Sequence, residues 1–188
     1  ARLSTTNIPA GIDASEIFTQ SNLTTKITTQ PTLAQTAYYN DPAYGSSGPL
    51  PMKVGQETTF TMHWQMTNPG NDVSGAKIVG TLQPGVTWKN IVSAGQGQNQ
   101  PTYNKNTSQV IWDMGVLPHG VGVGLPKYEA TFQISVKPSV NQQGQTLTLM
   151  KSTSFSGTDS FTRQNIVVPA SDLTSQDLVD RPGEGTVQ

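Results

Sequence analysis

Two histidines, His63 and His119, have the widest chemical repertoire in this sequence, because an imidazole can act as an acid, a base or a metal ligand near neutral pH. Neither has a second ligand-type residue two or four positions further on, and the sequence holds no H-E-x-x-H motif. His63 lies on the polar side of an alternating stretch, and His119 lies in a Pro-Gly loop. We therefore expect both to be solvated or locally hydrogen-bonded.

Hydrolytic chemistry has little support in the sequence. A serine nucleophile needs a shaped turn and a base, and no G-x-S-x-G motif occurs. Glycoside hydrolysis needs two converging carboxylates, whereas Asp113, Glu129 and Asp159 are isolated from one another in sequence. We expect that the protein is not an enzyme and carries no cofactor.

Calcium is the cation that the loops are best suited to hold, since it prefers oxygen ligands. Asn40-Asp41 and Asn71-Asp72 place oxygen donors in loops, so Asp41 and Asp72 are the candidate ligands. Neither loop has the alternating acids of a dedicated site. The alternative is that these residues only form turns.

A covalent crosslink, either a Lys–Asn isopeptide bond or a Thr–Gln ester, is a further chemistry open to a surface domain that lacks disulfides. Lys26, Lys77 and Lys137 lie in predicted strands, and side-chain amides are abundant. All three lysines fall on the polar side of their strands, which favours exposure.

The composition indicates a setting outside the cell. Charged residues make up only 12% of the chain, about half the usual share, and Thr, Ser, Gln, Asn and Gly replace them. A net charge of −1 provides no field for nucleic acid or anionic membrane, and no apolar run approaches the length of a membrane span. The absence of cysteine excludes disulfides and thiolate metal sites.

The elements that position these side chains are strands. Residues 57–67 alternate apolar and polar side chains without interruption, and residues 129–137 do the same. Turn signals recur every 8–12 residues, which predicts about eight or nine short strands in a two-sheet antiparallel β-sandwich. The predicted core residues are Phe60, Met62, Trp64, Trp88, Trp112, Phe132 and Ile134.

Three regions follow from this pattern. Residues 23–169 form the predicted sandwich, beginning with the alternating Leu23, Thr25 and Ile27. Residues 1–22 are a weakly patterned extension, and residues 170–188 read as a polar, solvated tail or linker. We hypothesise that a strand-like segment within residues 1–30 pairs with an exposed sheet edge of a neighbouring subunit. The alternative is that the extension packs on its own domain.

Several motifs along the predicted sandwich occur in a fixed order: Thr67-Asn-Pro-Gly-Asn71, then Leu82-Gln-Pro-Gly-Val86, then Trp112-Asp-Met-Gly115. This series resembles the immunoglobulin-like repeat domains of large prokaryotic cell-surface and cell-wall proteins, with Gln83 as a minor departure from their pattern. The resemblance implies an immunoglobulin-like β-sandwich and a scaffold role.

Three functional readings follow. The first is a structural or adhesive domain that associates with itself or with neighbouring surface domains, as in a filament. The second is a module that binds a glycan or a protein through loops at one end, with the aromatic residues Tyr38, Tyr39, Tyr44 and Tyr103 as candidate contacts. The third is an accessory domain of a larger secreted enzyme.

Overall fold

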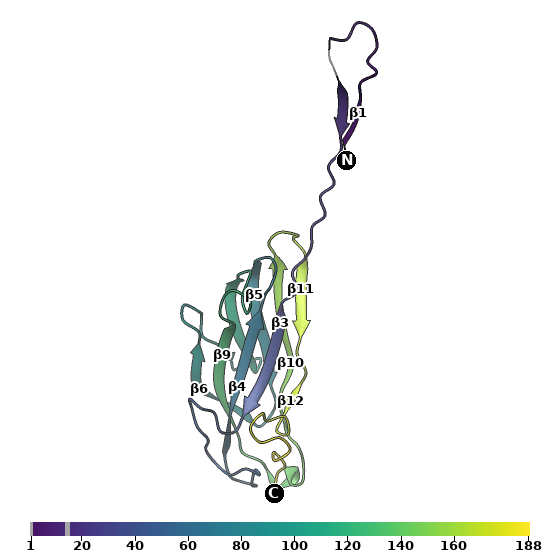
Figure 1. Ribbon diagram of the computed structural model, residues 1–188. Coiled ribbons are helices and arrows are strands. Elements are labelled where there is room, and N and C mark those ends of the chain that lie inside the picture. Colours follow the sequence, from purple (N-terminus) through teal and green to yellow (C-terminus); the bar gives the residue numbers. More distant parts are fainter. Residues whose placement is uncertain (1, 14–15) are drawn as a thin grey trace.

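Two β-sheets stacked face to face make up the body of the molecule, and a separate two-stranded ribbon lies at its N-terminal end (Figure 1). The structure is a computed structural model, and it describes residues 2–13 and 16–188. The strands are β1 (Arg2–Thr5), β2 (Ile17–Gln20), β3 (Thr32–Tyr38), β4 (Thr58–Thr67), β5 (Val73–Leu82), β6 (Val86–Ala94), β7 (Thr102–Asn104), β8 (Gln109–Leu117), β9 (Tyr128–Val136), β10 (Thr148–Asp159), β11 (Asn165–Pro169) and β12 (Leu173–Thr174). A single-turn 3-10 helix, η1 (Val140–Gln142), lies between β9 and β10.

The strand order is that of an immunoglobulin-like sandwich. One sheet has the order β3-β4-β9-β6, and the other has the order β11-β10-β5-β8-β7 with β12 also beside β10. Immunoglobulin domains place strands A, B, E and D in one sheet and C, F and G in the other. Here β3, β4, β9 and β6 take the first set of places, β5, β10 and β11 take the second, and the β7–β8 hairpin extends the second sheet.

The predicted fold class, an all-β immunoglobulin-like sandwich, is confirmed, with four and six strands in its sheets instead of a total of eight or nine. In the described part of the chain, no helix is long or apolar enough to cross a membrane.

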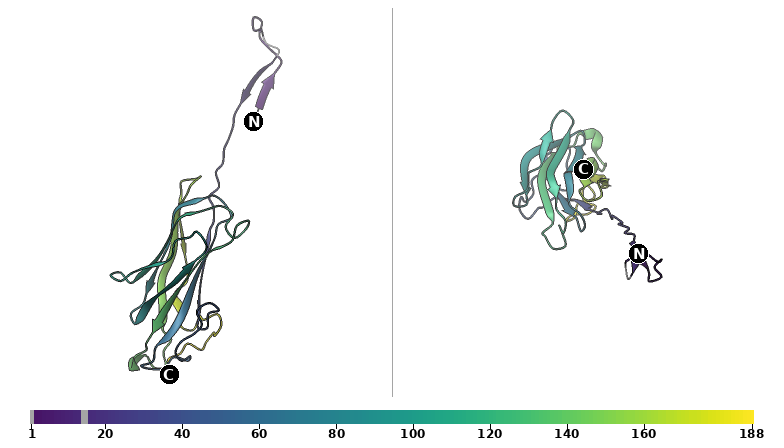
Figure 2. Two further views of the ribbon diagram at one scale, coloured as in Figure 1. Left: turned by 90° about the vertical axis from the view of Figure 1, so that its left-hand side faces the viewer. Right: turned by 90° about the horizontal axis from the view of Figure 1, so that it is seen from above.

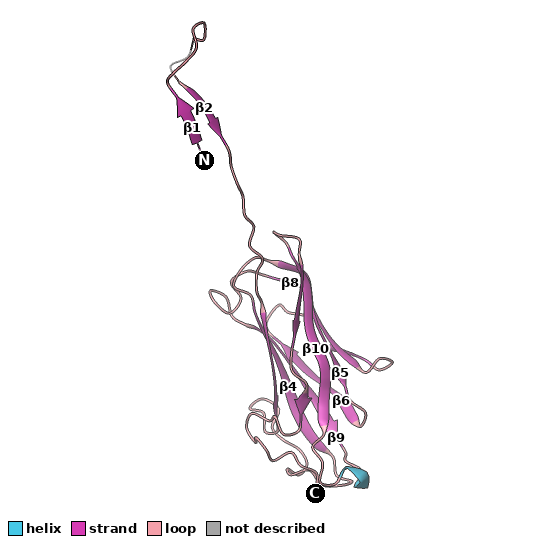
Figure 3. Ribbon diagram, turned by 90° about the vertical axis from the view of Figure 1, so that its right-hand side faces the viewer, coloured by secondary structure: helices cyan, strands magenta, loops and turns pink. Residues whose placement is uncertain are grey.

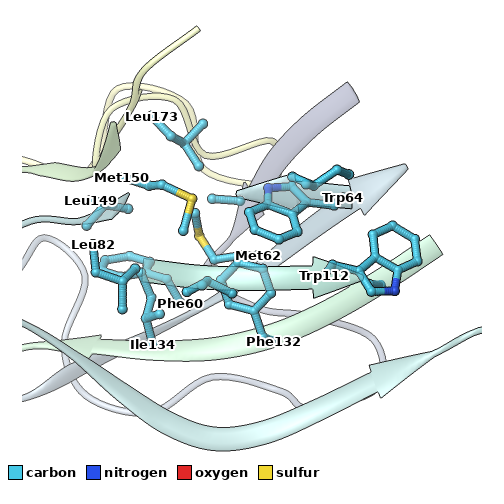
Figure 4. Close-up of a cluster of buried hydrophobic side chains, with 14 of the residues drawn as sticks. Phe60, Met62, Trp64, Leu82, Trp112, Phe132, Ile134, Leu149, Met150 and Leu173 are labelled. Atoms are coloured by element: carbon cyan, nitrogen blue, oxygen red, sulfur yellow. The ribbon is translucent and has the colours of Figure 1, made fainter. Parts of the chain in front are cut away.

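The core lies between the sheets and is built on the two strands with the clearest alternation. β4 and β9 pair in antiparallel register, which sets Met62 opposite Phe132 and Trp64 opposite Ala130. Six of the seven predicted core residues are fully buried, and Figure 4 shows Phe60, Met62, Trp64, Trp112, Phe132 and Ile134 packed together. Trp88 is the exception, since it is half-buried at the rim, where its ring stacks on Tyr103 with centroids 5.6 Å apart.

The polar face of the four-stranded sheet is covered by the chain between β3 and β4. Residues 41–45 form a closed turn, in which the backbones of Asp41 and Gly45 exchange two hydrogen bonds. Further along, the Ser47 amide donates to Thr59 Oγ1 at 3.0 Å. As a result, Thr59 and Thr61 are buried although they lie on the polar side of β4.

The C-terminal segment is part of the sandwich, which corrects the prediction of a solvated tail at residues 170–188. Its apolar side chains Leu173, Leu178 and Val187 are buried, and so is Ser175. Figure 1 shows this stretch, at the yellow end of the colour bar, as β12 and loops at the end of the sandwich that carries the C-terminus, and Figure 3 shows the helical turn η1 at the same end. We call residues 173–188 the C-terminal clasp. Its polar residues occupy the turns between the few apolar ones, so average composition hides its role.

The N-terminal region forms the ribbon β1–β2, joined to the sandwich by an extended segment (Figure 2). The prediction that the sandwich begins at residue 23 does not hold, because residues 21–31 belong to no strand and β3 begins at Thr32. The alternating pattern at Leu23, Thr25 and Ile27 is present, but no strand of the described chain pairs with it.

Candidate functional site

The N-terminal arm, which we define as residues 2–13 and 16–28, exposes apolar side chains from its ribbon and from its extended segment. Leu3 is 73% exposed, Phe18 59%, Leu23 93% and Ile27 77%. In the ribbon, Leu3 lies opposite Thr19 and Phe18 lies opposite Ser4, so the two apolar side chains point from opposite faces. A two-stranded ribbon is marginal in water unless something covers it. The arm therefore has the features of a segment that is buried by a partner.

A buried carboxylate fixes the base of the arm to the sandwich. Asp159 is fully buried at the end of β10. Its Oδ2 accepts hydrogen bonds from the Thr29 amide at 2.8 Å and from Asn71 Nδ2 at 2.9 Å. Its Oδ1 accepts from the amides of Phe161 and Thr162 at 2.8 and 2.9 Å. Burial acts to raise the pKa of Asp159, but these four donors outweigh it and hold that pKa well below its usual range.

A second buried side chain, Asn68, completes this attachment. Its Oδ1 accepts from the Thr29 hydroxyl at 2.6 Å, while the Gly70 amide donates to the same hydroxyl at 3.0 Å. Asn68 Nδ2 donates to the carbonyl oxygens of Leu117 and Pro118 at 3.1 and 3.0 Å. Thr29 is thus held from both sides. The arm residues just before it are bonded to the sandwich as well, since the Ile27 carbonyl accepts from Asn71 Nδ2 at 2.8 Å and the Thr28 hydroxyl donates to Gln164 Oε1 at 3.0 Å.

The sandwich has two open strand edges of useful length. Among the described residues, β6 pairs only with β9, and β11 pairs only with β10. The outer edge of β3 is different, because the clasp covers it through a bridge from Ala37 to Leu178 and a hydrogen bond from the Val179 amide to the Ala37 carbonyl at 2.9 Å. An incoming strand would therefore find unpaired backbone at β6 or β11.

A cluster of titratable side chains lies on the polar face of the four-stranded sheet. His63 Nε2 lies 2.7 Å from Asp41 Oδ2, and His63 Nδ1 lies 3.1 Å from Glu129 Oε1. The His63 side chain is only 16% exposed and that of Asp41 only 1%. The expectation of a solvated or locally bonded His63 is therefore wrong. The loop that follows β3 brings Asp41 over the sheet, and strand periodicity gives no sign of that.

The carboxylates of this cluster are held in their ionised form. Burial acts to raise the pKa of Asp41, but the hydrogen bond from His63 and those from the amides of Ala43 and Tyr44 lower it below its ordinary value. For Glu129, burial is likewise outweighed by hydrogen bonds from His63 and Gln65, so its pKa is also lowered. Both ring nitrogens of His63 are thus engaged by carboxylate oxygens within the cluster.

The other candidate residues take part in the fold itself. The four tyrosines are half-buried instead of exposed. Tyr38 contacts His63 edge-on with ring centroids 4.9 Å apart, Tyr39 donates its hydroxyl to the Gly48 carbonyl at 2.7 Å, and Tyr44 lines a cavity. Ligand contact by these tyrosines stays a prediction.

The calcium candidates, Asp41 and Asp72, lie in different loops, and each is already bonded to other protein groups. Asp41 bonds His63, whereas Asp72 Oδ1 accepts from the amide and from Nδ1 of the exposed His119 at 2.7 and 2.8 Å. Within the described ranges, no three His, Asp or Glu side chains gather as metal ligands. Lys26 donates to the Phe161 carbonyl at 3.1 Å, while Lys77 and Lys137 are exposed. Calcium binding and a lysine crosslink stay predictions.

Sequence reasoning missed the residues that hold the arm. Asp159 shows a local signal, since it accepts from the amides two and three residues on, as an acidic residue often does in a turn. Its bond to Thr29, 130 positions away, has no signal in a single sequence.

Comparison with known proteins yields similar folds only. No protein-family model and no curated protein sequence matches the chain. Similar solved structures include the full-length major pilin SpaD of Corynebacterium diphtheriae, at 12% identity and a TM-score of 0.47, with 77% of this chain and 35% of that one covered. They also include BcpA, the major pilin subunit of Bacillus cereus, at 12% identity and a TM-score of 0.49, with 93% and 47% covered.

This chain spans about a third to a half of the length of those pilins. At such identities, and with TM-scores below 0.5, the likeness carries no argument about function. The functional argument rests on the residues of this chain.

Proposed function

We propose that this chain is a non-enzymatic structural subunit of a prokaryotic cell surface, whose copies join by β-strand addition. In this arrangement the N-terminal arm of one copy pairs with an open sheet edge of the next. The observation that carries the proposal is the extended segment of the arm, which alternates like a strand and lies outside every sheet. The composition of the whole chain and its nearly neutral polar surface support a location outside the cell.

The segment at residues 22–28 fits the role of donor strand. Leu23 and Ile27 share one parity and are 93% and 77% exposed, while Thr24, Lys26 and Thr28 share the other. Added to an open edge, such a strand would lay its apolar side on the neighbour's core and keep its polar side in water. Burying these two side chains would contribute about 1.5–3 kcal/mol each before association costs.

The attachment at Thr29 supports the same reading. Thr29 follows the donor segment directly, and two buried polar side chains, Asp159 and Asn68, hold it. A segment that serves only as a loose leader has no need of such a fixed base. A subunit that transmits tension to its neighbour does need one, because the load must enter the folded body at a rigid point.

Assembly of the full chain tests the proposal. We expect the wild-type protein to form concentration-dependent oligomers in light scattering and linear particles in electron microscopy. The double variant Leu23→Asp, Ile27→Asp should remain monomeric at the same concentrations, because two charges cannot be buried against a neighbour's core. Val140→Asp is the matched control, since Val140 is 71% exposed and lies in η1, away from the arm.

Disulfide trapping identifies the acceptor edge, and the absence of native cysteine makes introduced pairs unambiguous. Ile27→Cys combined with Val167→Cys should yield dimers linked across β11, whereas Ile27→Cys combined with Ile91→Cys reports on β6. A wild-type chain that stays monomeric throughout, or oligomers that the double aspartate variant leaves unchanged, would contradict the proposal.

A further inference from the structure

A cavity of about 310 Å³ lies between the turn at residues 41–45 and strands β6 and β9. Its lining includes the acid–histidine cluster, namely Asp41, His63 and Glu129, and the hydroxyl side chains Tyr44, Ser93 and Thr131. The volume is at the small end of ligand pockets, on the scale of a single sugar ring.

The cluster holds one carboxylate ready for a ligand. Glu129 Oε1 is bonded by His63 at 3.1 Å and by Gln65 Nε2 at 3.1 Å, while no hydrogen bond within the described structure uses its Oε2. Two partners on one oxygen fix the orientation of the carboxylate, so the second oxygen can accept from a ligand without an ordering cost. The Glu129 side chain is 43% exposed, which leaves that oxygen accessible.

Hydroxyl groups provide the rest of the polar lining. Tyr44 Oη and Thr131 Oγ1 lie 3.4 Å apart, a long contact that a ligand hydroxyl could replace with two shorter ones. Ser93 sits beside Thr131 across the β6–β9 pairing and lines the same cavity. Hydroxyls both donate and accept, so this wall matches a partner that does the same.

The lining selects among ligand classes. It contains no Lys or Arg, and two carboxylates lie within it, which disfavours phosphate, sulfate and acidic ligands. Both nitrogens of His63 are engaged by carboxylates, and among the described residues no three ligand-type side chains gather here to hold a metal ion. A neutral ligand with several hydroxyls is the best complement to one free carboxylate oxygen and three hydroxyl side chains.

We propose that this cavity binds one pyranose unit of a carbohydrate, with Glu129 Oε2 accepting from sugar hydroxyls and with Ser93, Tyr44 and Thr131 completing the contacts. The site lies on the sheet face, away from the arm and from β11, so it is independent of an assembly through the β11 edge; Ser93 belongs to β6, so a strand added at that edge would lie beside it.

Titration of the ¹⁵N-labelled full chain, in its monomeric Leu23→Asp, Ile27→Asp form if wild type is too large for NMR, tests this site. The probes are the methyl glycosides of glucose, galactose, mannose and N-acetylglucosamine, each up to about 50 mM, because a single sugar in a small pocket binds at millimolar Kd. We expect at least one glycoside to cause saturable shifts at the amides of Ser93, Gly95 and Thr131.

Two variants place the binding in the cavity. Glu129→Gln and Ser93→Ala should each raise the Kd, the first by about tenfold because it removes an ionised acceptor. Glu57→Gln is the matched control and should leave the Kd unchanged, since Glu57 bonds Lys89 away from the cavity. No saturable shift with any of the four glycosides overturns the proposal. Shifts with ethylammonium chloride alone, or an unchanged Kd in Glu129→Gln, also overturn it.

Discussion

A chain that ends at residue 172 will not form a stable sandwich at 25 °C, because it loses the C-terminal clasp. Leu173, Leu178 and Val187 are 6%, 1% and 1% exposed, and burial of each contributes about 1.5–3 kcal/mol. Typical domains have only about 5–15 kcal/mol of stability in total. We expect the truncated chain to lose its near-ultraviolet circular dichroism and its cooperative melting transition.

The clasp also satisfies backbone groups that would otherwise be left open. The Leu147 amide donates to Ser175 Oγ at 3.0 Å, and the Ser175 hydroxyl donates to the Gly185 carbonyl at 2.6 Å. At the chain end, the Gln188 amide donates to the Met52 carbonyl at 2.7 Å. Truncation would therefore expose both apolar surface and unpaired polar groups at one end of the core.

A single methyl group tests the same contact without truncation. A Cβ at Gly185 would lie 1.6 Å from the Ser175 carbonyl oxygen, so Gly185→Ala forces the backbone of the clasp to shift. We expect a loss of about 3 kcal/mol in the free energy of unfolding by urea. Gly124→Ala is the control, since a Cβ there meets nothing within 4 Å. Equal stabilities for the two variants would show that the clasp is dispensable.

The fold was predictable where one strand face alone meets the core. β4 and β9 alternate apolar and polar side chains because the apolar sides of both strands face the same core. A period of two in the sequence is the direct result of that arrangement. The same logic misplaced the start of the sandwich at Leu23. An alternating pattern indicates that a segment can pair as a strand, but it does not indicate that a partner strand exists within the same chain.

The candidate sites were less predictable because they depend on loops that return to the sheets. His63 faces the polar side of β4 as expected, but Asp41 approaches it from 22 positions away. The C-terminal clasp has too few apolar residues for composition to reveal it, although three of them are buried. In each case the missing information is the path of an irregular segment, which single-sequence patterns do not encode.

Replacing Asp159 with asparagine should lower the melting temperature at pH 7 by roughly 10 °C and loosen the base of the arm. Each carboxylate oxygen accepts two N–H groups, from Thr29 and Asn71 on one side and from Phe161 and Thr162 on the other. An asparagine must turn its own NH₂ group toward one of these pairs, whichever way it is oriented. Two donors then face another donor in a buried site, and no rotation removes the conflict.

The pH dependence of the melting temperature distinguishes the role of Asp159 as a buried carboxylate from a general packing defect. The pKa of Asp159 is lowered in the folded state relative to about 3.9 in the unfolded chain, so its contribution is complete above about pH 4 and is lost as pH falls through the folded-state value. The difference in melting temperature between wild type and Asp159→Asn should therefore be constant from pH 7 to about 5 and shrink in stronger acid. A packing defect would give a difference that does not change with pH.

Hydrogen exchange shows whether the loss of stability in Asp159→Asn includes the attachment of the arm. In Asp159→Asn the Thr29 amide should lose its protection, because Asp159 Oδ2 is its acceptor at 2.8 Å. Asp113→Asn is the control, since Asp113 is exposed and its carboxylate accepts from the nearby Gly115 amide. If Thr29 stays protected and both variants melt within a degree or two of wild type, then Asp159 does not hold the arm, and a load on residues 22–28 would have to enter the sandwich elsewhere.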